Sequence, residues 1–332
     1  MQGDIVWTDL VGHRVVVRRV VGPRHGHPHY SDVLGYLVAA DADALVVRRA
    51  DGTRISVAAA EVHRVKAVPP RPVRATRADV LALAEVAALG WPAPDTDRIG
   101  RWLLRAADGF TGRANSVLPL GDPGLNLPDA LARVEAWYAE RGLPARFQVP
   151  LPARADLDAA LAGLGYAEAR DPTYVLTAEL AGALAATGGM RPDPGGPTRP
   201  GHQVRLDPEP GPDWLTGYHY RATTKLPPVA VRIMTAHPRV VFASALRDGR
   251  TVAVARAVVD RGWAGVTALE VRPDQRRQGL AGLLMSALLD WAGGLGAGRV
   301  YLQVARGNAP ALAFYDRLGF ARHHQYHYRL RP

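Results

Sequence analysis

The sequence has no cysteine and only two lysines among its 332 residues, and each absence narrows what the protein can be. Without cysteine there is no disulfide, no thiolate metal site and no cysteine nucleophile. No apolar run reaches the roughly 18 residues that a membrane span needs, and no signal-peptide pattern opens the chain. We therefore expect a cytoplasmic protein. The G-x-S-x-G, Walker and H-E-x-x-H motifs are also absent, which excludes the enzyme classes that depend on them.

Acidic residues are scarce relative to basic ones, and the imbalance is uneven along the chain. The formal net charge is +10, and 39 of the 41 basic residues are arginine. Residues 1–70 carry a net charge of +2 and residues 71–200 a net charge of −1, whereas residues 201–332 carry +9. Abundant arginine, alanine, glycine and proline are typical of a GC-rich genome, so a high isoelectric point does not by itself indicate nucleic-acid binding. The local excess predicts that something anionic binds the last section.

The length and the turn signals divide the chain into three parts. Residues 1–68 contain short β-branched runs that predict a small antiparallel β-barrel, and they resemble an SH3-like barrel. A middle section (residues 74–180) and a C-terminal section (residues 203–332) each alternate helices and strands, and residues 181–203 between them read as a linker. We therefore predict an α/β (α+β) protein in which mixed twisted sheets are flanked by helices.

The ends of the two larger sections are similar in sequence. The stretch LDAALAGLGYAEA at 157–169 matches LAFYDRLGFARHH at 312–324, and Gly165 and Gly319 occupy corresponding places. This similarity indicates an internal duplication, and a chance match of two α/β units is the alternative.

The run VRPDQRRQGLAGLLMSALLDWA at 271–292 carries the clearest chemical signal. A strand ends there, an arginine-rich loop follows, and Gly279 opens an amphipathic helix. The glycine allows close approach to the backbone, and the unpaired amides of a first helical turn attract anions. Arg272, Arg276 and Arg277 add full positive charges. The pattern predicts a phosphate or pyrophosphate site, and an exposed basic turn before a surface helix is the alternative.

These residues resemble the GNAT superfamily of acyl-CoA-dependent N-acyltransferases. The family's pyrophosphate loop, Arg/Gln-x-x-Gly-x-Gly/Ala, is matched by Arg276, Gly279 and Ala281, and its second signature is matched by YLQVARGNAPALAFYDRLGF at 301–320. The middle section resembles a second GNAT unit without the arginine–glycine loop, so we expect it not to bind acyl-CoA. Tandem units preceded by a small barrel resemble actinobacterial members of the family.

The resemblance implies roles for individual residues, with acetyl-CoA as co-substrate and no metal. The strand backbone from Leu269 to Val271 would bond the pantetheine arm and the acyl carbonyl, and Asn308 would contact the pantetheine. Tyr315 would protonate the leaving thiolate, because a phenol with a pKa near ~10 suits a thiolate whose conjugate acid lies near ~8–9. The pyrophosphate would bind at one continuous segment: Arg276, Arg277, Gln278, Gly279, Leu280, Ala281 and Gly282.

Each of these side chains also has a purely structural interpretation. Asn308 is an expected helix N-cap, and Tyr315 shares a helix face with apolar residues and is then part of the core. Glu270 is our candidate for the base that deprotonates the amine; the alternative is a carboxylate paired with an arginine. His219 and His237 are weaker candidates, and deprotonation through water is a further alternative.

The predicted reaction moves an acetyl group from acetyl-CoA to a primary amine of a small molecule or peptide. Without cysteine a cysteine thioester relay is impossible, which favours direct attack in a ternary complex. The alternatives are a coenzyme A-binding sensor or scaffold and a nucleic-acid-associated protein; the low charge of residues 1–70 argues against nucleic acid. A homodimer is compatible with the sequence. His25, His27 and His29 alternate, but Gly26 and Pro28 favour a loop, so we predict no metal site there.

Overall fold

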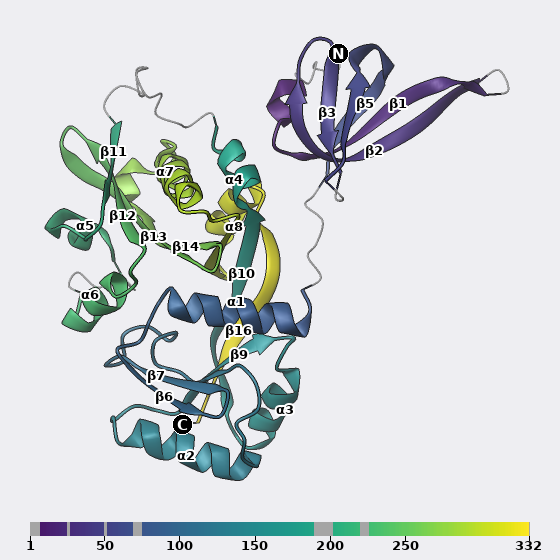
Figure 1. Ribbon diagram of the computed structural model, residues 1–332. Helices are drawn as coiled ribbons and strands as arrows, with labels where there is room; N and C mark the ends of the chain where they lie inside the picture. The colour runs from purple at the N-terminus through teal and green to yellow at the C-terminus, as the bar shows by residue number, and fades with distance from the viewer. Residues whose placement is uncertain are drawn as a thin grey trace.

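The computed structural model describes residues 7–24, 27–49, 52–68, 75–188, 202–219 and 226–331 of the protein. A small N-terminal sheet is followed by a larger α/β body built on one long sheet (Figure 1). Within these ranges, no helix is long and apolar enough to cross a membrane.

Five antiparallel strands make up the N-terminal sheet, in the order β4-β3-β2-β1-β5. Alternate residues such as Val15, Val17 and Leu37 are fully buried, and the residues between them are less buried. Strand β2 begins at His27, so residues 27–29 lie in a strand and not in the predicted loop, because they pair with the end of β1; His25 lies outside the described residues. The SH3-like barrel stays a prediction. The elements are η1 (Trp7–Leu10), β1 (Arg14–Arg24), β2 (His27–Ala40), β3 (Ala44–Arg48), β4 (Arg54–Ala58), η2 (Ala59–Glu61) and β5 (Val62–Ala67).

The middle section contains α1 (Arg77–Leu89), β6 (Asp95–Ile99), β7 (Trp102–Ala106), β8 (Leu118–Pro119), α2 (Leu127–Ala139), β9 (Arg146–Leu151), α3 (Ala155–Gly163), β10 (Ala167–Glu179) and α4 (Leu180–Ala186). The C-terminal section contains β11 (His202–Asp207), α5 (Pro212–Gly217), α6 (Pro228–Thr235), β12 (Val240–Arg247), β13 (Arg250–Asp260), β14 (Trp263–Val271), η4 (Pro273–Gln275), α7 (Leu280–Gly294), β15 (Arg299–Ala305), α8 (Ala309–Arg317) and β16 (Ala321–Leu330).

Part of the stretch that reads as a linker is regular structure. Residues 180–186 form α4, because Leu180 and Ala183 bury themselves against the core beneath α7. Strand β11 begins at His202, where its backbone pairs with β12. Both elements depend on distant neighbours, so the glycine and alanine content of the linker did not indicate them.

Side-chain caps fix the start of several helices. Thr76 and Asp79 form a reciprocal capping box on α1, and Asn126 caps α2. The predicted N-cap of α8 is present, because the Asn308 side chain accepts a hydrogen bond from a backbone amide of the first turn. Helix α7 differs, since its N-cap is Gly279, which has no side chain to donate or accept.

The long sheet joins the middle and C-terminal sections by an exchange of their last strands. Its order is β11-β12-β13-β14-β15-β10-β16-β9. Strand β10 of the middle section lies between β15 and β16 of the C-terminal section, and β16 in turn pairs with β9 of the middle section. Each section therefore supplies the strand that completes the sheet of the other.

Two apolar clusters cover opposite faces of the C-terminal half of this sheet. Helices α4, α7 and α8 pack on one face, with Leu284 and Leu288 of α7 fully buried (Figure 1). On the other face, α5 and α6 pack together with Trp91 and the loop 107–114 of the middle section. The middle section thus reaches the sheet face opposite α7.

Candidate active site

Strands β14 and β15 run parallel but separate before they end. Their paired residues run from Trp263 with Arg299 to Val266 with Leu302, and then stop, although β14 continues to Val271. A β-bulge in β14 accompanies the separation, because Ala268 has a positive φ of 55° and the register with β13 shifts there. Beyond Val266, the backbone of β14 on the side of β15 is therefore available for hydrogen bonds to a ligand.

The first turn of α7 presents unpaired amides beside that strand end. The first amide of α7 with a helical acceptor is that of Leu283, which donates to Gly279 at 3.0 Å. No described residue accepts the N–H groups of Leu280, Ala281 and Gly282. Gly279 has φ 81° and Arg277 φ 61°, so two residues in the left-handed region turn the loop into the helix. The arrangement fits an anionic group such as a pyrophosphate.

Hydrogen bonds from arginines hold this loop in place. Arg276 donates through Nε to the Val271 carbonyl oxygen at 3.3 Å, which ties the loop to the end of β14. Arg247 of β12 donates to the side-chain oxygens of Gln275 at 3.1 Å and Gln278 at 3.2 Å. The loop is therefore braced before any ligand binds.

Glu270 and His219 form a pair on the other face of β14. The side chains of Leu269 and Val271 pack toward the core under α7, while Glu270 points toward the α5 side. One Glu270 oxygen accepts the His219 backbone N–H at 2.7 Å, and the other lies 3.0 Å from His219 Nδ1. The partner of Glu270 is therefore a histidine and not the arginine considered from the sequence. When Nδ1 is the donor, Nε2 of His219 is the ring nitrogen that can accept a proton, and no described residue bonds it.

His237, the other histidine considered, lies away from this pair. Its Nδ1 is 3.1 Å from the carbonyl oxygen of Arg239, and its Nε2 is 3.2 Å from an Asp260 carboxylate oxygen. Asp260 pairs with Trp263 at the turn between β13 and β14, the end of the hairpin opposite Glu270. His237 thus supports that turn.

Tyr315 lies on the α7 side of the sheet. Its side chain is buried in the apolar cluster that contains Leu280. The centroid of its ring lies 5.1 Å from that of Phe314 and 5.5 Å from that of Phe320. Burial raises the pKa of the phenol well above its ordinary value, so the hydroxyl stays protonated at neutral pH. Tyr315 is a core residue, as one interpretation of the sequence expected, and its hydroxyl is protonated at neutral pH.

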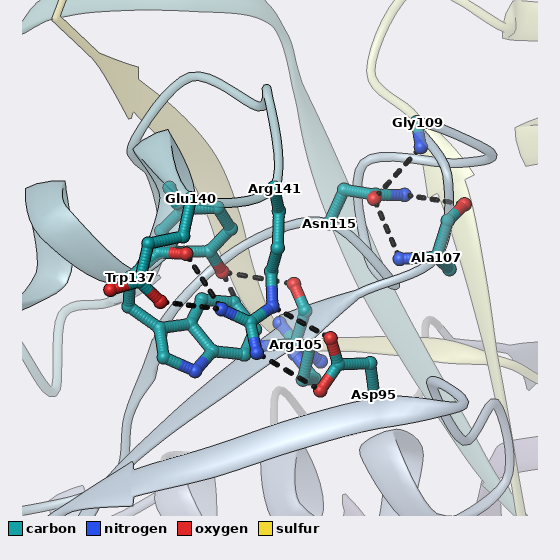
Figure 2. A network of polar contacts seen from close by, with 9 residues as sticks. Asp95, Arg105, Ala107, Gly109, Asn115, Trp137, Glu140 and Arg141 are labelled. Carbon is teal, nitrogen blue, oxygen red and sulfur yellow. Dashed lines mark hydrogen bonds and ion pairs between the residues drawn. The ribbon is translucent and has the colours of Figure 1, made fainter.

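The loop 107–114 of the middle section packs on the face of the sheet that carries Glu270. Figure 2 shows Asn115 reaching back to Ala107 and Gly109, whose amides donate to its side-chain oxygen at 2.8 and 3.0 Å. Its amide group donates to the carbonyl oxygens of Phe110 and Thr111 at 2.8 and 2.9 Å. Asn115 is thus a buried cross-link, because all its hydrogen-bonding groups serve the loop.

Two arginines near this loop went unnoticed in the sequence. Arg256 is fully buried on β13, and Arg113 extends from the loop to Gln303 of β15. For Arg256 a signal exists, since an arginine interrupts the apolar run TVAVARAVV at 251–259. For Arg113 there is none, because its partner is 190 residues away.

Comparisons with known proteins agree with this geometry. Residues 77–329 match the family model described as "Probable histone acetyltransferase Rv0428c C-terminal". The protein of that name from Mycobacterium tuberculosis is 32% identical over 333 residues, which cover 98% of this chain and 96% of that protein. An uncharacterised N-acetyltransferase of Bacillus subtilis, YobR, is 27% identical over 76% of this chain and 99% of its own length.

Solved structures share the fold. A tandem GNAT protein from the clavulanic acid biosynthesis pathway superposes with a TM-score of 0.52 at 16% identity, covering 79% of this chain and 90% of its own. A GCN5-related N-acetyltransferase from Kribbella flavida gives a TM-score of 0.55 at 18% identity, covering 76% and 95%. The chain therefore belongs to the Rv0428c C-terminal family of the GNAT superfamily and is a GNAT-type, acyl-CoA-dependent N-acetyltransferase.

Proposed function

We propose that the C-terminal section transfers an acetyl group from acetyl-CoA to a primary amine of a small molecule or peptide by direct attack in a ternary complex. The observation that carries the proposal is the set of free first-turn amides of α7 beside the open end of β14. These amides, with Arg276 and Arg277, would hold the pyrophosphate. The edge of β14 near Leu269 and Val271 would then bond the pantetheine arm and the acyl carbonyl.

The two proton transfers of the reaction are assigned to opposite faces of β14. On the α5 side, the Glu270 carboxylate fixes the His219 ring so that Nε2 accepts the proton of the attacking amine. On the α7 side, Tyr315 donates its proton to the thiolate that leaves when the C–S bond breaks. The amide N–C bond forms between these two faces, and amides of β14 near Val271 stabilise the oxyanion of the tetrahedral intermediate.

We propose that only the C-terminal section binds acyl-CoA, as the lack of an arginine–glycine loop in the middle section suggests. Helix α2 occupies the place in the middle section that α7 occupies in the other. Its first turn is already capped by Asn126, carries the acidic Asp129, and has Pro128 in place of one N–H donor. An anion at that helix end would meet a carboxylate and few free amides, which supports the assignment.

Thiol release from acetyl-CoA in the presence of an amine panel tests the proposed function. The panel contains amino acids, polyamines, aminoglycosides and peptide N-termini, and binding of acetyl-CoA is measured in parallel by calorimetry. Amine-dependent thiol release with formation of the acetylated amine is the expected result. Tight binding of acetyl-CoA without release for any amine would instead favour a coenzyme A sensor or scaffold. Salt-dependent binding of nucleic acid without affinity for acetyl-CoA would favour a nucleic-acid-associated protein.

A further inference from the structure

Arg256 is fully buried in the face of the sheet that carries Glu270. Its Nε donates to the Met234 carbonyl oxygen at 2.8 Å, and its Nη1 lies 3.0 Å from the Gly90 carbonyl oxygen and 3.3 Å from Thr267 Oγ1. Its Nη2 is buried and has no hydrogen-bond partner among the described residues. A buried guanidinium with an unused donor costs free energy unless an acceptor reaches it.

Arg113 brings a second positive charge to the same place. Its Nη1 donates to Gln303 Oε1 at 3.0 Å, and its Cζ lies 4.6 Å from the centroid of the Trp91 ring. The Cζ of Arg256 lies 5.3 Å from that same ring. Thr267 and Gln303, which the two guanidiniums contact, directly follow the last paired residues of β14 and β15. The two charges therefore flank the point where the strands separate.

No acidic side chain among the described residues forms an ion pair with either guanidinium. The nearby carboxylates are already engaged, because Glu270 bonds His219, and Asp108 lies 3.7 Å from Arg232 on the exposed rim. Desolvation by burial, with Arg113 as an additional like charge, lowers the pKa of Arg256 to about 9. Two cations thus share an environment to which no residue in the described ranges contributes a compensating anion.

The residues that surround the two arginines are held by hydrogen bonds of their own. Trp91 Nε1 donates to Thr111 Oγ1 at 3.1 Å, which anchors the shared indole to the loop that carries Arg113. Asn115 cross-links that loop through four hydrogen bonds of 2.8 to 3.0 Å. A preorganised pair of donors loses little entropy when an anion binds between them.

We propose that the amine acceptor carries a carboxylate, which Arg113 and Arg256 bind while the amine lies at His219 and Glu270. This inference rests on the proposed function and adds a substrate class to it. Thr267, at the arginines, and Glu270 are three residues apart on β14, a span of at most about 10 Å. One small amino acid can bridge that span, and the planar fork of arginine matches a carboxylate. A lysine-rich peptide would instead place ammonium groups beside two guanidiniums.

The test compares ω-amino acids of increasing length with their neutral carboxamides. For each pair, kcat/KM is measured from thiol release, and binding of the amino acid is measured by calorimetry with coenzyme A present. We expect the carboxylate form to be preferred about ten- to hundredfold at the best length. Arg113→Gln should abolish that preference, whereas Arg98→Gln, which removes an exposed charge from the same section, should leave it intact. Arg256→Lys, which keeps a charge but loses the fork, should reduce it.

The possible outcomes distinguish failure of this inference from failure of the proposed function. Efficient acetylation of carboxamides, polyamines or a lysine-rich peptide without preference for the carboxylate would overturn the inference and leave the N-acetyltransferase proposal standing. Binding of the amino acid that Arg113→Gln abolishes, with no acetyl transfer to any amine, would support the anion site and contradict the proposed function. An equal preference in Arg113→Gln and in the unmodified protein would overturn the role of the arginines. An aminoalkyl phosphonate that outperforms every carboxylate would reassign the site to phosphorus oxyanions.

Discussion

Replacing Glu270 by glutamine removes the group that orients His219. The carboxylate oxygens face two donors, the backbone N–H of His219 at 2.7 Å and its Nδ1 at 3.0 Å. A glutamine amide can accept only one of these hydrogen bonds, and its NH2 group opposes the other donor. The lost charge-assisted hydrogen bond corresponds to about 1.5–3 kcal/mol, or roughly a ten- to hundredfold fall in kcat.

Steady-state thiol release measures this loss, with acetyl-CoA affinity and thermal unfolding followed in parallel. The side chains of His219 and Glu270 are 41% and 29% exposed, so the stability of the variant should change by less than about 1 kcal/mol. Its rate should recover as the pH rises, because more of the acceptor amine is then unprotonated. Glu209→Gln, which alters an exposed carboxylate of the same section, is the control. A Glu270→Gln variant that turns over normally at neutral pH would refute the role of Glu270 in orienting the base.

Four further outcomes are expected. Gly279→Ala should weaken acetyl-CoA binding in calorimetry and cost about 1–2 kcal/mol of stability, because φ there is 81°. Tyr315→Phe should lower turnover and leave acetyl-CoA affinity unchanged; normal turnover would contradict its role as acid. The fragment 203–332, expressed alone, should show no cooperative unfolding by circular dichroism, since it lacks β10, and addition of residues 74–202 should restore it. Burial lowers the pKa of His324 to about 3, so protonation of the unfolded chain should reduce stability as the pH falls from about 6.5 toward 3; His324→Gln should flatten that slope in denaturant titrations.

The parts that the sequence predicted are those whose signals are local. The amphipathic run of α7, the glycine before it and the N-cap Asn308 lie within a few residues of one another, so their pattern indicates both element and boundary. Local signals were also sufficient to identify the family.

The features that escaped prediction are contacts over long distances in the sequence. His219 and Glu270 are 51 residues apart, and only the fold shows that they bond. The exchange of β10 and β16 was not foreseeable, because a strand carries no mark of which section it will pair with. Helix α4 is short and alanine-rich, and it is stable only because α7 covers it.

The middle section has a structural reason to be retained even without a pyrophosphate loop. It supplies β10, which borders β15, and it supplies the loop that places Arg113 over Trp91. A single section would leave β15 with an unpaired edge and the face carrying Glu270 without that loop. The two proposals assign separate roles to arginines of the C-terminal section. Arg276 and Arg277 lie on the loop proposed for the cofactor's pyrophosphate, and Arg256, completed by Arg113 from the other section, lies where an anionic acceptor would bind.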